Sequence, residues 1–165
     1  MAKQVEELET ERLILRGIRE DDAPEIVKWR SDPEIYRYFK NPHKITLEEH
    51  LQWFHDRYLP DENRLDWMCI EKATGNKIGV FGLIIEGNEA EINYLLAPEA
   101  QHKGYASEAI ECQILFIEKN NINRVIAEIH GENLPSIALA KRLGLNFLKS
   151  ENHFVIFYRD LTAIL

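Results

Sequence analysis

Seven residues near the middle of the chain have the types and spacing expected of a turn that binds an anion. The segment QHKGYAS follows a strand-like stretch and opens a long helical pattern. Small residues let one backbone approach another closely, and the N–H groups of a helix's first turn have no partner within the helix. Beside the positive end of the helix dipole, such groups suit a phosphate or pyrophosphate. The other interpretation is a strand–helix turn that needs its glycine only for shape. The seven residues are Gln101, His102, Lys103, Gly104, Tyr105, Ala106 and Ser107.

A second candidate binding feature is the start of the next helical pattern. Asn133 and Ser136 stand in its first turn, and the pattern closes at Gly144. The side-chain oxygen of Asn133 can contact a ligand, but it can equally cap the N–H groups of its own helix. The sequence leaves both roles open.

Glu91 is the candidate for acid–base chemistry because it lies on the strand that precedes the anion-binding turn. Alternation along the strand places Glu91 on the same face as Asn93 and Leu95, and on the face opposite Tyr94. A carboxylate there can accept a proton from a reacting group. The alternative is that Glu91 is one of several acids at a solvated strand start. His130 is the next candidate for the base.

The elements that must position these residues alternate between strand-like and helix-like patterns. Strands are predicted over residues 11–18, 67–72, 77–85, 89–97, 124–130, 146–149 and 153–159. Helices are predicted over residues 23–30, 47–58, 104–119 and 134–143. Thr46 and Glu49 have the spacing of a capping box before the second of these helices.

The connections between these segments predict their arrangement. Short turns at Gly75 and Gly87 join three strands into an antiparallel meander. The strand–helix–strand unit over residues 89–130 predicts a right-handed crossover, and hence a parallel pair. The predicted fold class is therefore mixed α/β, a meander leading into a βαβ unit, in a single domain of residues 1–165.

Composition excludes several classes of protein. The 165 residues are 45% apolar and 29% charged, which are ordinary globular values. No apolar run is long enough to span a bilayer, and the first residues lack the apolar core of a signal peptide. Two cysteines give no disulfide framework, so we expect a cytoplasmic protein. The formal charge of -8 argues against nucleic-acid binding and favours a cationic partner such as a protonated amine.

These motifs together resemble those of a known family. Gln-x-x-Gly-x-Ala at 101–106, then Asn-x-x-Ser at 133–136 and a helix closing on a Leu-Gly pair, resemble the GNAT superfamily of acetyl-CoA-dependent N-acetyltransferases. The N-terminal segment 10–16, TERLILR, is similar to the start of the ribosomal-protein N-terminal acetyltransferase branch. The order of elements matches over about residues 10 to 160. The resemblance implies a splayed central sheet, acetyl-CoA as cosubstrate, an amine acceptor, and a monomer or homodimer.

The resemblance also implies roles for individual residues. The backbone of residues 101–107 would hold the pyrophosphate of coenzyme A. Leu95, Leu96 and Ala97 would pair with the pantetheine arm in the gap where the sheet splays. Asn133 and Ser136 would contact the pantetheine from the other side of that gap. In several relatives a glutamate near the position of Glu91 is the general base, often acting through water.

One position departs from the family's pattern. Many members carry a tyrosine four residues after the Ser136 position, which protonates the leaving thiolate, and here that residue is Ala140. The thiolate could leave unprotonated or take a proton from water. Ser136 is a weak substitute, so the sequence names no general acid.

Substrate recognition is expected from the first two helices. The segments around Arg30 and Trp53 resemble a stretch in the amino-sugar-nucleotide N-acetyltransferases of pseudaminic-acid biosynthesis. Arg30 could meet a phosphate and Trp53 could stack on a ring. The favoured alternative is that Trp29, Trp53 and Phe54 pack the helices together and that Arg30 pairs with an acid. His50 and His55 lack the i, i+4 spacing of a helical metal pair, and we expect no metal site.

Three functions therefore compete. The leading one is an N-acetyltransferase that acts on a protein N-terminal amine or on a small primary amine. The second is an amino-sugar-nucleotide N-acetyltransferase. The third is a catalytically weak acyl-CoA-binding module, which Ala140 suggests.

Overall fold

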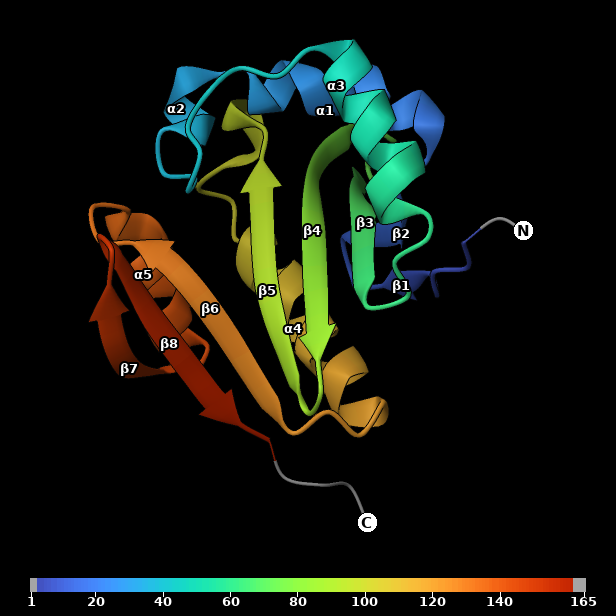
Figure 1. Ribbon diagram of the computed structural model, residues 1–165. Coiled ribbons are helices and arrows are strands. Elements are labelled where there is room, and N and C mark those ends of the chain that lie inside the picture. Colours follow the sequence, from blue (N-terminus) through green and yellow to red (C-terminus); the bar gives the residue numbers. More distant parts are fainter. Residues whose placement is uncertain (1–2, 162–165) are drawn as a thin grey trace.

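The computed structural model describes residues 3–161, and an eight-stranded sheet runs through it in the order β1-β2-β3-β4-β5-β6-β8-β7 (Figure 1). The strands are β1 (Leu8–Glu9), β2 (Leu13–Gly17), β3 (Arg64–Glu71), β4 (Lys77–Glu86), β5 (Glu89–Leu96), β6 (Arg124–His130), β7 (Asn146–Glu151) and β8 (Phe154–Asp160). The helices are α1 (Ala23–Arg30), α2 (Pro33–Tyr36), α3 (Leu47–Trp53), α4 (Tyr105–Lys119) and α5 (Leu134–Arg142). Shorter turns are η1 (Glu20–Asp22), η2 (Phe54–Tyr58) and η3 (Pro98–Ala100).

The predicted mixed α/β fold is confirmed. Strands β2 to β5 form an antiparallel meander, and β5 pairs in parallel with β6 after the α4 crossover. The capping box is also present, since the N–H of Glu49 donates to the Thr46 hydroxyl at 3.1 Å. The sequence did not predict β1 or α2, and the start of β3 lies three residues before the predicted position 67.

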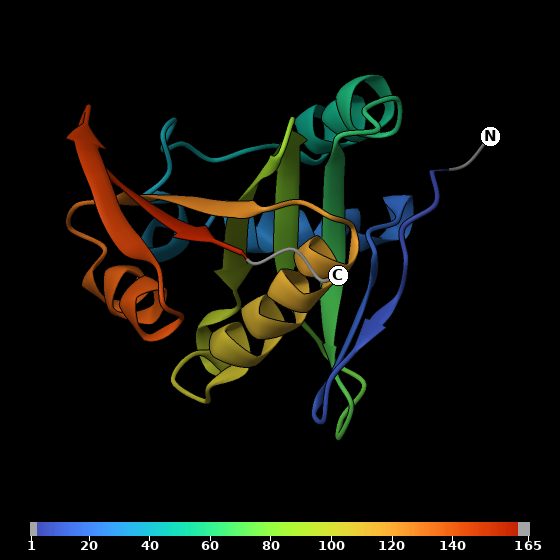
Figure 2. The same cartoon turned by 90° about the horizontal axis from the view of Figure 1, so that it is seen from below.

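The helices cover the two faces of the sheet unequally. Figure 2 shows α3 on one side and both α4 and α5 on the other. On the α4 side, Trp67, Phe81 and Tyr94 stand in register across β3, β4 and β5. The rings of Phe81 and Tyr94 stack with centroids 5.4 Å apart, and Trp67 meets Phe116 of α4 edge-on at 5.3 Å. This aromatic row anchors α4 and ends at β5.

The sheet opens between β5 and β6. These strands pair only from Glu89 to Glu91 on β5, opposite Arg124 to Ile126 on β6. Beyond that point β5 stays with β4 as far as Leu96, while β6 stays with β8 as far as His130. Figure 1 shows the two strands diverging toward α2 and the loop that follows it. We call this opening the fork, and Glu91 stands where it begins.

A buried ion cluster ties α1 to β2 and β4. The Asp22 carboxylate accepts hydrogen bonds from the Arg16 guanidinium at 2.8 and 2.9 Å, from the Lys77 ammonium at 2.8 Å and from the N–H of Arg19 at 2.8 Å. Burial opposes the charged form, but the bonds from Arg16 and Lys77 outweigh it and lower the pKa of Asp22 to about 2. The carboxylate is therefore stabilised by folding.

We predict that Asp22→Asn lowers the free energy of unfolding at pH 7 by about 2 to 3 kcal/mol, the amount that this pKa change represents. Because the pKa is depressed in the folded state, this contribution is present above about pH 4 and is lost as the pH falls through about 2. Urea unfolding at pH 7, 4 and 2.5 measures the effect. The exposed neighbour Asp21→Asn is the control, and a variant at Asp22 with the wild-type acid sensitivity would contradict the prediction.

Candidate functional site

The loop before α4 presents free backbone N–H groups. Gly104 is the N-cap residue of α4, has a left-handed φ of 80°, and makes no side-chain cap. Glycine adopts this conformation without a steric penalty. The N–H groups of the first turn therefore point outward at the positive end of a 15-residue helix. This geometry can bind a pyrophosphate.

Two side chains of the loop, those of Gln101 and Tyr105, make hydrogen bonds within the protein. The Gln101 amide donates to the carbonyl oxygen of Leu96 at 3.2 Å, and the Tyr105 hydroxyl donates to Glu71. His102 has a φ of 64°. The side chains of His102 and Lys103 are both exposed. The loop therefore offers an anion both its backbone and the exposed side chains of His102 and Lys103.

Arg12 adds a positive charge beside this loop. Its guanidinium pairs with Glu108 of α4 at 2.7 Å and donates to the carbonyl oxygen of Lys103 at 3.0 Å. Thr10 also bonds to Glu108 through its hydroxyl. The N-terminal TER motif therefore fixes the start of α4. No site role was predicted for Arg12, although it lies in the N-terminal motif that resembles the ribosomal-protein branch.

The hydrogen-bonding pattern between β5 and β4 decides which residues of β5 direct their backbone groups to the fork. The N–H of Ala97 donates to the carbonyl oxygen of Ile78 at 2.8 Å, so this pair is hydrogen-bonded. Because hydrogen-bonded and non-hydrogen-bonded pairs alternate, Leu95 directs its N–H and C=O to β4, whereas Tyr94 and Leu96 direct theirs to the fork. The backbone groups expected to meet the pantetheine at Leu95 therefore belong to its two neighbours.

The first turn of α5 forms the far side of the fork. The Asn133 side chain accepts a hydrogen bond from the N–H of Ser136 at 3.4 Å, which is the N-cap role. The Ser136 hydroxyl lies 2.9 Å from the Tyr94 hydroxyl. Ala140 is buried, with 5% of its surface exposed, and brings no polar atom to the fork. Tyr94 of β5 nevertheless brings a phenol to the fork.

Glu91 lies on the opposite face, which α3 covers. It stands in one row with Arg64 of β3, because Ile84 pairs with both residues. Burial raises the pKa of Glu91, and repulsion from Glu128 of β6 raises it further, while Lys40 and Arg64 oppose the shift. The rise makes Glu91 a stronger base than a solvated glutamate.

Glu128 and Lys40 are functional candidates that the sequence did not identify. Glu128 lies two residues beyond Ile126, just past the last β5–β6 pair. The Lys40 ammonium, carried by the loop after α2, pairs with its carboxylate. Strand register and a loop conformation bring these residues to Glu91, and no sequence pattern encodes that proximity.

His130 is the more distant candidate base. It lies four residues beyond Ile126 along β6, which is roughly 13 Å at about 3.3 Å per residue. Its Nδ1 accepts a hydrogen bond from the N–H of Glu132 at 3.1 Å, and its ring packs 5.5 Å from Tyr38. These contacts hold the ring at the open end of the fork.

Trp53 and Arg30 both lie above the Glu91 face. Trp53 stacks on Tyr58 with centroids 5.4 Å apart, and the guanidinium carbon of Arg64 lies 5.1 Å from its ring. Arg30 lies 5.7 Å from the Phe39 ring, and burial, aided by the charge of Arg64, lowers the pKa of Arg30. Trp53 therefore packs, as the alternative interpretation expected, and also reaches the row that contains Glu91.

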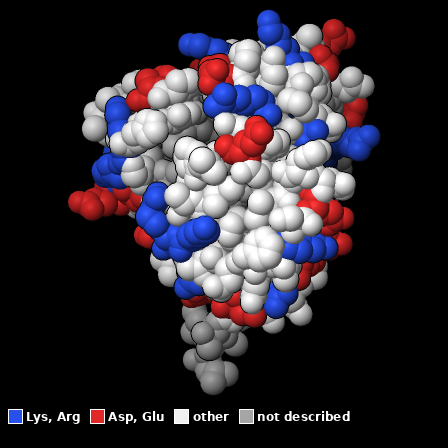
Figure 3. Space-filling model, turned by 90° about the vertical axis from the view of Figure 1, so that its left-hand side faces the viewer, with Lys and Arg blue, Asp and Glu red and all other residues white. Residues whose placement is uncertain are grey.

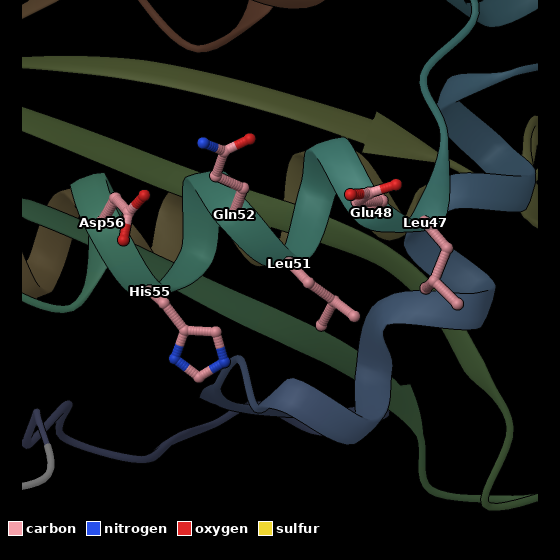
Figure 4. Close-up of a pocket in the computed structure, with 6 residues that line it drawn as sticks. All are labelled: Leu47, Glu48, Leu51, Gln52, His55 and Asp56. Atoms are coloured by element: carbon pink, nitrogen blue, oxygen red, sulfur yellow. The ribbon is translucent and has the colours of Figure 1, made fainter.

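A depression of about 600 Å³ lies elsewhere, on the outer side of α3 and η2. Figure 4 shows Leu51 and His55 directed to one side of the helix and Gln52 to the other. His55 contacts Glu20 at 2.8 Å. The lining residues are Leu47, Glu48, Leu51, Gln52, His55 and Asp56. None of them faces the fork, so this depression is separate from the candidate site.

Three further observations concern metal ligands, membrane-spanning helices and surface charge. Within residues 3–161, no group of three or more His, Cys, Asp or Glu side chains is arranged to hold a metal ion. No helix in that same range is long and apolar enough to cross a membrane. On the face that Figure 3 shows, acidic and basic side chains are interspersed around uncharged surface.

Comparison with known proteins assigns the family. The family model for the acetyltransferase (GNAT) domain matches residues 12–146. The chain belongs to the GNAT acetyltransferase family. It is 35% identical over 147 residues to an uncharacterized N-acetyltransferase, p20, of Bacillus licheniformis, covering 84% of this chain and 82% of the relative. This GNAT protein is thus an acetyl-CoA-dependent acyltransferase.

Solved GNAT structures share its fold. Spermidine N-acetyltransferase from Vibrio cholerae, in complex with CoA and spermine, matches with a TM-score of 0.82 and 19% identity, covering 93% of this chain and 98% of that one. RimL, a ribosomal L7/L12 α-N-protein acetyltransferase in complex with CoA, matches with a TM-score of 0.79 and 20% identity, covering 96% of this chain and 100% of that one. Both structures show that this chain has the GNAT fold.

We predict that Lys40→Met raises the pKa of Glu91, because the substitution removes a cation that stabilises its carboxylate. A titration followed by carboxyl ¹³C NMR measures the change. Lys44→Met, on the same loop, is the control and should leave the pKa of Glu91 unchanged. A pKa of Glu91 that stays constant or falls in Lys40→Met would show that the loop does not reach the fork.

Proposed function

We propose that this enzyme transfers the acetyl group of acetyl-CoA to a primary amine, either the α-amine of a protein N-terminus or a small-molecule amine. The observation that carries the proposal is the fork, which begins at a partly buried glutamate, Glu91, and ends beside the uncapped start of α4. A thioester lying in the fork would be within reach of both faces of β5. An amine could approach from the Glu91 face.

The residues on the α4 side suit coenzyme A. The backbone of residues 101–107 would hold the pyrophosphate, with the Arg12 guanidinium beside it. The gap-facing backbone of Tyr94 and Leu96 would pair with the pantetheine amides like an added strand. Asn133 and Ser136 would bound the pantetheine on the α5 side. Gln101 and Tyr105 would contribute through the loop's shape and backbone.

Glu91 would remove the proton from the amine. Only the neutral amine attacks a thioester, and an α-amine has a reference pKa of about 7.7–8.0, against about 10.4 for a lysine side chain. The raised pKa of Glu91 brings the base closer to that of an α-amine. Arg30 and Trp53 would line the acceptor side above it.

The choice of acceptor is tested by acetyl-CoA turnover with a panel of amines. The panel holds N-terminal peptides, polyamines, aminoglycosides and amino-sugar nucleotides. Turnover with a peptide or a small amine supports the proposal. Turnover restricted to amino-sugar nucleotides would favour the second function. Tight binding of acetyl-CoA without transfer to any amine would favour the binding module.

We predict that Gly104→Glu weakens acetyl-CoA binding at least tenfold, because it places a side chain and a negative charge where the pyrophosphate would lie. Isothermal titration calorimetry measures the affinity. Gly87→Glu is the matched control, because Gly87 also has a positive φ, 59°, and stands in the turn at the opposite end of β5. Unchanged affinity in a folded Gly104→Glu protein would remove the loop from the cofactor site.

We also predict that Glu91→Gln lowers kcat by about 10²–10⁴-fold, the usual cost of losing a general base, while acetyl-CoA affinity holds. The loss should shrink as the pH rises, because the amine then deprotonates without help. The exposed Glu89→Gln, on the same strand, is the control. A deficit that does not vary with pH would point to amine positioning instead, and a wild-type kcat would exclude Glu91 from the reaction.

A further inference from the structure

Acetyl transfer leaves a thiolate that has to be neutralised. When the amine nitrogen bonds to the acetyl carbon, the carbon–sulfur bond breaks and its electron pair stays on sulfur. A side-chain proton donor speeds that step if it can reach the sulfur. Position 140 on α5 is an alanine, so α5 offers no phenol there. A phenol that protonates the sulfur therefore has to come from another element.

Tyr94 places a phenol at the fork. It lies three residues beyond Glu91, on the stretch of β5 that no longer pairs with β6. Its own N–H and C=O face the fork, so its side chain leaves the backbone beside the path proposed for the pantetheine. The ring is held by its stack on Phe81, with an interplanar angle of 6°.

The Tyr94 hydroxyl bridges the two sides of the opening. It lies 2.9 Å from the hydroxyl of Ser136, in the first turn of α5. A serine hydroxyl can donate and accept at once, so Ser136 can direct the phenol and return a proton to it. Two other buried phenols have partners away from the fork. Tyr58 bonds to the backbone of Asp66, and Tyr105 bonds to Glu71 beside the start of α4.

We propose that Tyr94 is the proton donor to the coenzyme A thiolate, and that Ser136 is the positioning residue that directs its hydroxyl. This inference rests on the proposed acetyl transfer. Starting from the neutral amine, the N–H proton lost on acetylation goes to Glu91, which returns it to solvent. The Tyr94 O–H proton goes to sulfur, and the phenolate regains a proton from solvent through Ser136. The products are the N-acetylated amine and free coenzyme A, so atoms and charge balance.

The two faces of β5 separate the two proton transfers. Glu91 and Tyr94 are an odd number of residues apart, so their side chains leave β5 on opposite faces. The base therefore meets the amine on the α3 side, and the acid meets the departing sulfur on the α5 side. Burial raises the pKa of Tyr94, which keeps the phenol protonated and ready to donate.

The test compares Tyr94→Phe, Ser136→Ala and a matched control, Tyr158→Phe on β8. Tyr94→Phe keeps the ring that stacks on Phe81 and removes only the hydroxyl. We expect the single-turnover rate of acetyl transfer to fall by about 10²–10⁴-fold in Tyr94→Phe, with acetyl-CoA affinity unchanged by calorimetry. The control should keep the wild-type rate.

Profiles of rate against pH distinguish a proton donor from a structural side chain. In the wild type, the rate should fall at high pH as the Tyr94 phenol ionises. This alkaline limb of the pH–rate profile should be absent in Tyr94→Phe. The Ser136 hydroxyl lowers the pKa of Tyr94 by bonding to it, so Ser136→Ala should move the limb to higher pH. An ultraviolet difference titration of the free protein should show the same upward shift without any turnover.

Three outcomes would overturn the proposal. A wild-type rate in Tyr94→Phe would remove the phenol from the reaction while acetyl transfer itself stands. A reduced rate with the alkaline limb retained would assign Tyr94 a packing role. If the wild-type protein binds acetyl-CoA but acetylates no amine, the proposed function fails, and the role of Tyr94 fails with it.

Discussion

The early end of pairing between β5 and β6 is the constraint on which the site depends. After Glu91, β6 follows β8 and β5 follows β4, so one edge of β5 loses its hydrogen-bonding partner inside the sheet. Unpaired backbone groups are costly unless they meet water or a ligand. An extended amide-bearing chain such as pantetheine satisfies them in the way that a neighbouring strand would. The opening is thus the edge of the sheet at which we propose that pantetheine binds.

The other fixed point is the start of α4, and residues distant in sequence hold it. Thr10 and Arg12 reach Glu108, which lies 98 and 96 residues further along the chain, and Gln101 ties the loop back to the end of β5. These bonds leave the loop's N–H groups free while restricting its conformation. A binding surface made of backbone needs this support, because its affinity depends on several dipoles pointing at one place. The N-terminal motif therefore acts on the cofactor side although it begins far from it.

Sequence reasoning identified the elements better than it identified their proximity. Hydrophobic periodicity and the turns at Gly75 and Gly87 predicted the meander, the crossover and the side-chain faces of β5 correctly. The same alternation does not say which neighbouring strand each backbone group faces. The Leu95 backbone, which was expected to pair with pantetheine, faces β4, and the backbones of Tyr94 and Leu96 face the fork. Lys40, Arg64 and Glu128 come together through strand register and a loop, which leave no local pattern. Helix α2 is a single turn, too short to show a period.

The geometry of the fork changes the interpretation of the alanine at position 140. From sequence alone, it removed a proton donor and raised the possibility of a weak or inactive enzyme. In the structure, the hydroxyl beside Ser136 belongs to a strand residue instead of a helix residue. The ring of this phenol on β5 is held by the sheet itself, through its stack on Phe81, while Ser136 of α5 directs its hydroxyl. Because side chains alternate along a strand, one residue series can present a carboxylate to one face and a phenol to the other, with the reacting group between them.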